Sequence, residues 1–263
     1  SPDVRKVTFT GSTDVGKTLI RQSADTVKKL SMELGGNAPF IVFDDADLDA
    51  AVEGAMIAKY RNMGQTCVCT NRFYVQAGIH DAFVERLKAA TAALVVGNGA
   101  EPGVQQGPLI DEAAVEKVEA MISDAVAKGG QIVQGGRRHG NGGTFFEPTV
   151  ITGATSAMQF ATDEIFGPLS AVFKFSTEEE AISAANATEY GLAAYAYTRD
   201  LGRAFRLNDG LEYGLIGINS GLITTVEAPF GGLKESGMGK EGGSQGLEDY
   251  LSTKYVCLAG LKA

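Results

Sequence analysis

Seven short runs rich in β-branched and aromatic residues alternate along this chain with segments whose apolar residues recur at helical spacing. Strands that alternate with helices in this way form mainly parallel sheets covered by helices. The sequence therefore predicts an α/β fold. The expected helices cover residues 14–24, 47–63, 79–94, 111–128, 177–187 and 200–209. The expected strands are Val4–Thr10, Pro39–Phe43, Arg72–Gln76, Gln131–Val133, Ala171–Phe175, Ala193–Tyr197 and Leu215–Asn219.

The composition excludes several classes of protein. A length of 263 residues suits one large α/β domain or two smaller ones. A formal net charge of -9 argues against a nucleic-acid surface, which needs clustered Lys and Arg. No apolar run approaches the roughly 18 residues of a membrane span, and three cysteines do not make a disulfide framework. We expect no nucleic-acid partner, no membrane, no metal site, and a reducing, cytoplasmic location.

Residues 11–18, GSTDVGKT, match the phosphate-loop pattern G-x-x-x-x-G-K-[ST] between an expected strand and an expected helix. The apolar run at 39–45, PFIVFDD, could supply a magnesium-binding Asp, so a nucleoside triphosphatase is one alternative. That alternative explains nothing in the remaining two-thirds of the chain. What can still be inferred from this segment is general: the N–H groups at a helix start, around Gly11, Ser12 and Thr13, favour an anionic group such as a phosphate. An ordinary strand-to-helix turn is the simpler interpretation.

Two cysteines lie close together in residues 60–72, YRNMGQTCVCTNR. The preceding helix should end at Gly64, which puts Cys67 in a short connection before a strand, where reactive residues of α/β folds often lie. A cysteine nucleophile must form a thiolate, and its usual activator is a histidine. Neither His80 nor His139 has the surroundings of a catalytic base. The base should therefore be a carboxylate.

The best candidate base is Glu33, in SMELGGNAPF, because it lies between two apolar residues and before two glycines. A buried Glu has a raised pKa and can accept a proton near neutral pH. A simple structural role is the alternative for each residue. Glu33 would then be a paired or edge carboxylate, and Cys67 a buried thiol, since free Cys is among the most buried residue types.

Six motifs occur in one order across nearly the whole chain: FTGSTDVGK, ELGGNAPFIVFDDADLD, NMGQTCVCTNR, DEIFGPL, EYGLAAYAYTRD and INSGLITTVEAPFGGLKESGMGKEGG. Through them the chain resembles the NAD(P)-dependent aldehyde dehydrogenases. The resemblance implies a three-layer α/β/α fold with parallel-rich sheets, in which a partial cofactor domain precedes a complete catalytic domain. By this resemblance, the phosphate-loop match is the family's Gly-Ser-Thr turn, and the Lys-Thr that follows it is a chance match.

The resemblance assigns the chemistry. Cys67 corresponds to the nucleophile that attacks the aldehyde carbon, and hydride transfer to the nicotinamide then leaves a thioester on Cys67. Glu33 corresponds to the base that activates water for hydrolysis of that thioester. The residues that correspond to the contacts of the cofactor, NAD or NADP, are Gly11, Ser12, Leu34, Gly35, Glu164 and Phe166.

Within the family the chain resembles the succinate-semialdehyde dehydrogenases most, through RNMGQTCVCTNRFYVQ, GLITTVEAPFGGLKESG and LEDYLSTKYVC. By this resemblance Arg61 binds the substrate carboxylate, and a bidentate Arg suits that group well. Thr225, beside Thr224, stands where a Ser-Ser pair is common, and Phe230 completes the substrate contacts. The added methyl bulk leaves a glutarate-semialdehyde enzyme, or another aldehyde dehydrogenase, as the near alternative.

The resemblance also divides the chain into four parts. Residues 1–34 end a Rossmann-like cofactor domain, 35–235 form the catalytic domain, 236–250 return to the cofactor domain, and 251–263 form an oligomerisation strand. We expect the chain to be the C-terminal half of a homo-oligomeric enzyme, dimer or tetramer, that is inactive by itself. An alternative of another class is a half whose role is only structural or oligomeric, and a third is residual thioesterase or esterase activity at Cys67.

Cys69 takes no part in the basic mechanism. In an extended segment, residues two apart point to the same side, so Cys69 could approach Cys67. A Cys-x-Cys disulfide would be strained and readily reduced. We therefore predict that oxidation of this pair switches the enzyme off reversibly, with simple packing of Cys69 as the alternative.

Overall fold

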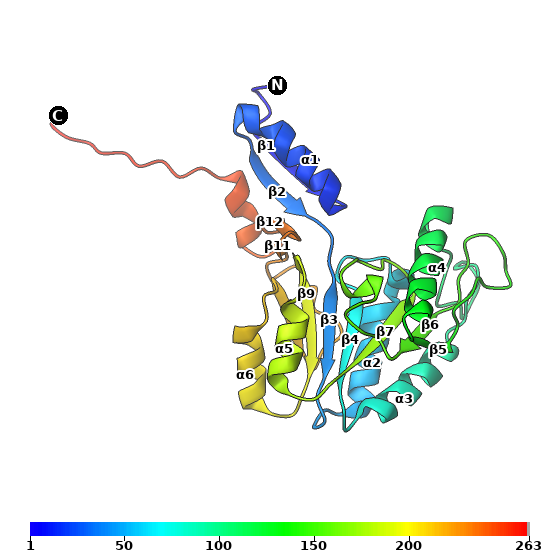
Figure 1. The fold of residues 1–263 in the computed structure, drawn as a ribbon. Coiled ribbons are helices and arrows are strands. Elements are labelled where there is room, and N and C mark those ends of the chain that lie inside the picture. The colour runs from blue at the N-terminus through cyan, green and yellow to red at the C-terminus, as the bar shows by residue number, and fades with distance from the viewer. Residues whose placement is uncertain (262–263) are drawn as a thin grey trace.

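The computed structural model describes residues 1–261, and its larger part is a seven-stranded sheet. Every neighbouring pair is parallel except β5 and β6, which are antiparallel. In spatial order the strands are β10 (Leu215–Ile218), β9 (Ala193–Tyr197), β3 (Ala38–Val42), β4 (Thr70–Gln76), β7 (Leu169–Phe175), β6 (Thr149–Thr152) and β5 (Gln131–Gln134) (Figure 1).

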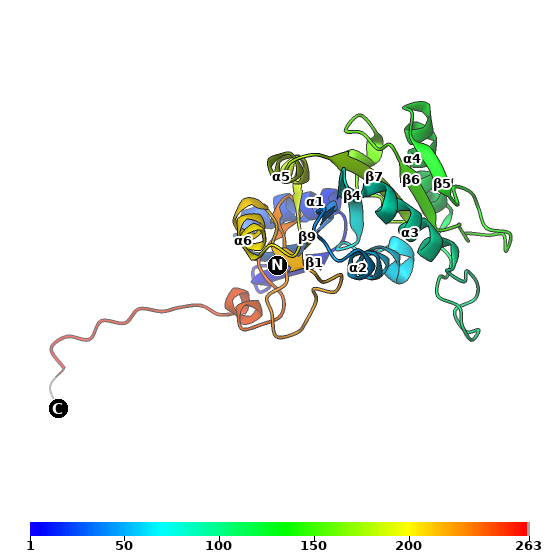
Figure 2. The same ribbon diagram turned by 90° about the horizontal axis from the view of Figure 1, so that it is seen from below.

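Helices cover both faces of this sheet (Figure 2). One face packs on α2 (Leu48–Tyr60) and α3 (His80–Ala92), and the other on α4 (Glu112–Ala127), α5 (Glu178–Asn186) and α6 (Leu201–Gly210). Side chains of a strand alternate between faces. Phe73 and Val75 of β4 therefore lie in the core under α2 and α3, while Tyr74 lies in the core under α4, α5 and α6. The three-layer α/β fold predicted from the sequence is confirmed.

A smaller sheet of three strands stands apart from the large one (Figure 1). Its strands are β1 (Lys6–Thr10), β2 (Lys29–Glu33) and β12 (Gly237–Met238), and α1 (Thr13–Ser23) follows β1. A 3-10 turn η1 (Ala24–Thr26) leads to β2, and η4 (Gln245–Tyr250) contacts β2 from the C-terminal side. Residues 34–37 connect β2 directly to β3, and residues 219–236 lead back from β10 of the large sheet to β12 of the small one.

All seven expected strands and all six expected helices are present, with ends shifted by a few residues. The caps Asp47 and Asp111 accept hydrogen bonds from the backbone N–H groups of Ala50 and Ala114, as N-cap residues do. The sequence prediction missed β2 and β6, as well as the two-residue strands β8 (Tyr190–Gly191), β11 (Leu233–Lys234) and β12. Short strands such as β2, β6 and the two-residue pairs carry too few residues to show a clear alternation.

The C-terminal residues differ from the expectation. No strand is present in residues 251–261, which are exposed and extend away from the body of the molecule (Figure 1). Residues 262 and 263, which complete the predicted oligomerisation strand, lie outside the described residues. Among residues 1–261 no helix is long and apolar enough to cross a membrane.

Candidate active site

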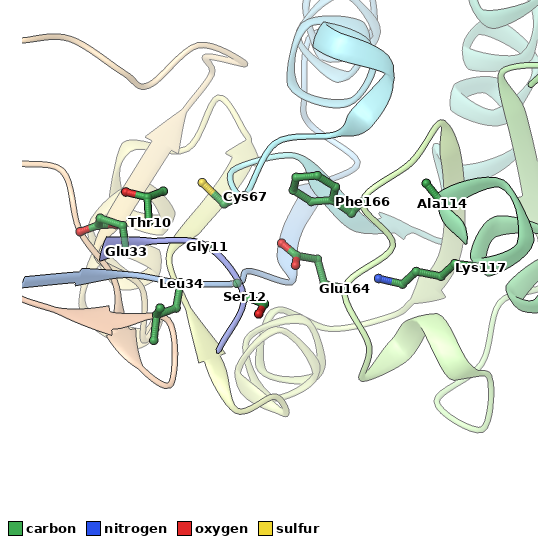
Figure 3. A pocket seen from close by; sticks show the side chains of 11 residues that line it. Thr10, Gly11, Ser12, Glu33, Leu34, Cys67, Ala114, Lys117, Glu164 and Phe166 are labelled. Carbon is green, nitrogen blue, oxygen red and sulfur yellow. The ribbon is translucent and has the colours of Figure 1, made fainter. Parts of the chain in front are cut away.

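A cavity of about 390 Å³ lies where β1, β2 and the start of α1 meet the end of the large sheet at which β3 and β4 begin. The sequence assigned chemistry or cofactor binding to eight residues, and all eight line it. Figure 3 shows Cys67 with Thr10 and Glu33 on one side and Glu164 and Phe166 on the other. The full lining consists of Thr10, Gly11, Ser12, Glu33, Leu34, Gly35, Cys67, Ala114, Lys117, Glu164 and Phe166.

The backbone before Cys67 makes an unusual turn. Helix α2 ends at Tyr60, earlier than expected, because Asn62 and Met63 adopt left-handed backbone angles, with φ of 54° and 58°, inside the 3-10 turn η2 (Arg61–Gly64). Gly64 continues in the same region, with φ 73°. A β-carbon at Gly64 would lie 2.2 Å from the carbonyl oxygen of Gly167, the residue after Phe166. Glycine is required there because no larger residue allows this approach.

Cys67 itself lies in a tight turn, closed by a 3.0 Å hydrogen bond from the N–H of Cys69 to the carbonyl of Thr66. Its carbonyl packs on Gly36, where a β-carbon would be only 2.3 Å from the Cys67 oxygen. Burial, with smaller contributions from the nearby carboxylates of Glu164 and Glu33, raises the pKa of the Cys67 thiol to about 11. The thiol is therefore protonated at neutral pH and needs a base that takes its proton.

Glu33 ends β2 and is 3% exposed. Its Oε2 has no hydrogen-bond partner among the described residues. Burial, together with the charge of Glu241, raises the pKa of Glu33 to about 8, and the opposing charge of Lys240 limits the shift. A carboxylate with a free oxygen and a pKa near neutral can both accept and release a proton. Glu241 and Lys240 were not singled out in the sequence, since only the fold brings residues 240 and 241 beside residue 33.

Glu164 forms the other wall of the cavity. Its Oε1 accepts a 2.9 Å hydrogen bond from the N–H of Gly36. Burial raises the pKa of Glu164, while the hydrogen bond from Gly36 and the charges of Lys117 and Lys59 act in the opposite direction. The ammonium of Lys117, on α4, points toward Glu164 (Figure 3). Lys117 is a lining residue that the sequence prediction missed, because a Lys on an amphipathic helix looks like any solvated lysine.

The start of α1 opens a second cavity of about 300 Å³, which shares Ser12, Gly35, Lys117 and Glu164 with the first. Ser12 is the N-cap residue, and its side chain makes no capping hydrogen bond. N–H groups at a helix start attract an anionic group. Because they share these residues, the two cavities together run from Cys67 past this helix start.

The lysine of the phosphate-loop match has a different role. Lys17 forms an ion pair with Glu235 at 2.5 Å, and the hydroxyl of Thr18 donates to the carbonyl of Asp14 within the helix. Both side chains have partners that a phosphate-binding Lys-Thr pair would have to give up.

The three residues assigned to the substrate do not line this cavity. Arg61 is exposed, and its side chain makes no hydrogen bond or ion pair within residues 1–261. Thr225 is exposed as well, and its hydroxyl donates a hydrogen bond to the carboxylate of Glu227. Phe230 is half-buried against the apolar cluster that Cys67 also touches. The structure thus does not bring Arg61 and Thr225 into a shared contact with Cys67.

The expectation that Cys67 and Cys69 lie in an extended segment is wrong. The segment is a turn and not an extended strand, so Cys67 and Cys69 are not simple same-side neighbours. The Cys69 thiol is buried, 2.9 Å from the Thr66 hydroxyl and 3.5 Å from the carbonyl oxygen of Lys59. Both cysteines are free thiols. This arrangement favours the packing alternative for Cys69 in the reduced protein.

Comparison with known proteins identifies the family of this chain. Residues 1–256 match the aldehyde dehydrogenase family, and the chain belongs to that family. It is 62% identical over 260 residues to a 3-sulfolactaldehyde dehydrogenase of Pseudomonas putida and 60% identical over 261 residues to a glutarate-semialdehyde dehydrogenase of Pseudomonas aeruginosa. Each alignment covers 99% of this chain and 54% of the relative, so the chain spans about half the length of these curated proteins.

A solved structure of a succinate-semialdehyde dehydrogenase from Burkholderia pseudomallei superimposes with a TM-score of 0.98 at 60% identity, covering 99% of this chain and 54% of that one. The resemblance inferred from the motifs is therefore confirmed at the level of the family. The nucleoside triphosphatase alternative is wrong.

Proposed function

We propose that the complete protein containing this chain oxidises a short aldehyde with a distal anionic group to the corresponding acid, using NAD or NADP. Succinic semialdehyde is the first candidate substrate and glutaric semialdehyde the near alternative. The observation that carries the proposal is the meeting of a partly buried thiol, Cys67, and a buried carboxylate with a free oxygen, Glu33, in one cavity.

The residues of the chain divide the chemistry between them. Glu33 takes the proton of the Cys67 thiol, and the thiolate attacks the aldehyde carbon to form a thiohemiacetal. A bound nicotinamide supplies the acceptor for the hydride that leaves that carbon. Cys67 then holds a thioester. Once Glu33 has released the thiol proton to solvent, it takes a proton from the water that attacks the thioester. The product acid leaves, Cys67 regains its proton, and the atoms balance as aldehyde plus water giving acid, two electrons and two protons.

The two connected cavities would hold the cofactor. The N–H groups at the start of α1, beside Gly11 and Ser12, would face the phosphates, and Glu164 would offer a carboxylate to sugar hydroxyls. Phe166, 38% exposed at the cavity wall, offers an aromatic face beside a planar ring. The preference between NAD and NADP stays open.

Arg61 supports the substrate class. A guanidinium that has no partner within residues 1–261, and that lies six residues before Cys67, is free to bind a carboxylate or sulfonate. The names of the relatives agree, since sulfolactaldehyde and the semialdehydes of glutarate and succinate all pair an aldehyde with an acid group.

The test compares kcat/KM for succinic semialdehyde with that for an uncharged aldehyde of equal length. We expect the acid to be favoured at least about 10-fold, and Arg61→Met to remove most of that preference while changing the uncharged aldehyde little. Equal rates for the two aldehydes would contradict the substrate class. Cys67→Ala should abolish turnover, and retained activity would remove Cys67 from the mechanism.

A further inference from the structure

Tyr195, in the middle of β9, reaches the turn that carries Cys67. Its ring is buried, 1% exposed, and its hydroxyl donates a 2.8 Å hydrogen bond to the carbonyl of Val68, the residue after Cys67. The two residues are 127 positions apart in the sequence. The bond therefore ties the turn to the centre of the large sheet.

The position of this hydrogen bond decides what it can do. Cys67 is the second residue of the turn closed by Cys69 and Thr66, and the peptide planes that follow it are those of residues 67–68 and 68–69. The first plane is fixed where the Cys67 carbonyl packs on Gly36. The second is fixed where the Val68 carbonyl accepts from Tyr195. The second plane also carries the Cys69 N–H, which holds the Thr66 carbonyl and with it the plane of residues 66–67. Because each peptide is planar, the planes on both sides of Cys67 are then fixed, and with them the two soft backbone dihedrals of Cys67.

Tyr195 is also the only one of two similar tyrosines that can serve this purpose. Tyr197 lies two residues further along β9, on the same face, and both rings pack on Phe40, with centroids 5.8 and 5.0 Å away. The hydroxyl of Tyr197 lies over the backbone of Gly54 and makes no hydrogen bond within residues 1–261. The sequence pattern does not distinguish these two tyrosines, since both are simply residues of one expected strand.

We propose that Tyr195 is a positioning residue for the nucleophile: its hydroxyl holds the Val68 carbonyl so that the Cys67 thiol stays directed into the cavity between Glu33 and Glu164. The inference rests on the proposed function for its effect on turnover. Its effect on the thiol does not depend on that function.

The experiment compares Tyr195→Phe with Tyr197→Phe in the complete protein. Tyr195→Phe keeps the ring and removes only the donor, so we expect kcat to fall about 10- to 100-fold with KM changed less than about 3-fold, since small displacements of reacting groups are costly. Tyr197→Phe should keep wild-type kcat. Equal losses in both variants would assign the effect to packing and overturn the proposal.

A second readout follows the thiol alone. Iodoacetamide labelling of Cys67, quantified by mass spectrometry from pH 6 to 11, reports the thiolate without any aldehyde or cofactor. The groups that face this thiol are Glu33, Glu164 and Cys69. Release of the turn lets the thiol move toward water, so the midpoint should fall in Tyr195→Phe and stay unchanged in Tyr197→Phe.

The two readouts separate the proposals. If the complete protein oxidises no aldehyde but the labelling midpoint still falls in Tyr195→Phe, the proposed function fails and the positioning role stands. Wild-type labelling and wild-type kcat in Tyr195→Phe would overturn the positioning role. So would failure of Tyr195→Phe to fold while Tyr197→Phe folds, because the hydroxyl would then support the fold as a whole.

Discussion

At the scale of single residues, the chemistry depends on one carboxyl group that changes its protonation near neutral pH. Burial and Glu241 raise the pKa of Glu33 to about 8. Below that pH the group is neutral and cannot act as a base. We expect hydrolysis of the acyl-enzyme to rise about 10-fold for each pH unit up to pH 8 and then to level off. Rapid-quench measurement of thioester hydrolysis between pH 6 and 10 isolates this step from the titration of Cys67.

The matched control for that profile is Glu33→Gln. It should lower hydrolysis about 10²- to 10⁴-fold and leave no rise with a midpoint near pH 8. A wild-type profile that is already flat between pH 6 and pH 8 would contradict the assignment.

Glu33 also makes stability depend on pH, and the sign follows from its raised pKa. Between about pH 4.5, the ordinary value, and about pH 8, the unfolded state is ionised while the folded state holds its proton. The unfolded state then binds fewer protons, so stability falls as pH rises through this window. Glu33→Gln removes the dependence, and we expect it to raise stability at pH 8 by about 1 kcal/mol. Thermal unfolding at pH 5 and pH 8 measures the difference, and a larger gain at pH 5 would contradict it.

The predicted redox switch between Cys67 and Cys69 requires a local rearrangement of the structure. The turn hydrogen bond between Cys69 and Thr66 and the burial of the Cys69 thiol must both be lost before a disulfide with Cys67 can form. We still expect peroxide to inactivate the enzyme slowly and dithiothreitol to restore it, with recovery lost in Cys69→Ala because Cys67 then oxidises irreversibly. Cys257→Ala, at an exposed thiol, is the control. Full recovery of the Cys69→Ala variant would assign Cys69 to packing alone.

At the scale of elements, the sequence predicted the helices and long strands because their patterns are local. It also placed Cys67 in the right connection. It could not predict the left-handed turn at Asn62 and Met63, because those angles depend on the close approach of Gly64 to Gly167, a residue more than 100 positions away. For the same reason it could not find Lys117 or Tyr195, which become part of the site only when α4 and β9 are packed.

Arg72 shows how one buried side chain connects elements. Its guanidinium donates to the carbonyls of Ala184 and Ala185 near the end of α5 and to the carbonyl of Asn37 before β3. Arg72→Met would remove a donor from each of these buried oxygens, although those of Ala184 and Ala185 keep the hydroxyls of Tyr74 and Tyr213, and we expect a loss of about 2–4 kcal/mol in stability. Arg206→Met is the control, because Arg206 pairs with Glu178 at the surface, where such pairs contribute about 0–1 kcal/mol. Equal shifts in Tm for the two variants would contradict the role of Arg72.

At the scale of the whole molecule, the apolar C-terminal segment is the feature that a single copy does not explain. Tyr255, Val256 and Leu258 are 86%, 61% and 73% exposed in residues 251–261. The large sheet meanwhile ends in the edge strands β10 and β5, whose outer hydrogen-bonding groups face no further strand within residues 1–261. Exposed apolar strands and open edges are liabilities that proteins cover. A second copy of the chain has both features, and mutual exchange of the segment between two copies would give a closed dimer.

We therefore expect a complete protein that ends at Tyr250 to lose its oligomeric state while keeping the fold of the catalytic part. Sedimentation velocity should show monomers for the truncated protein and dimers or tetramers for the intact one. The milder variant Leu258→Glu keeps the length of the chain and places a charge where an apolar contact is expected, so it should shift the equilibrium in the same direction. Lys254→Glu changes charge on the same segment without removing an apolar side chain and should leave assembly nearly intact. An unchanged oligomer after truncation would show that other surfaces hold the copies together, and the segment would then need a different partner.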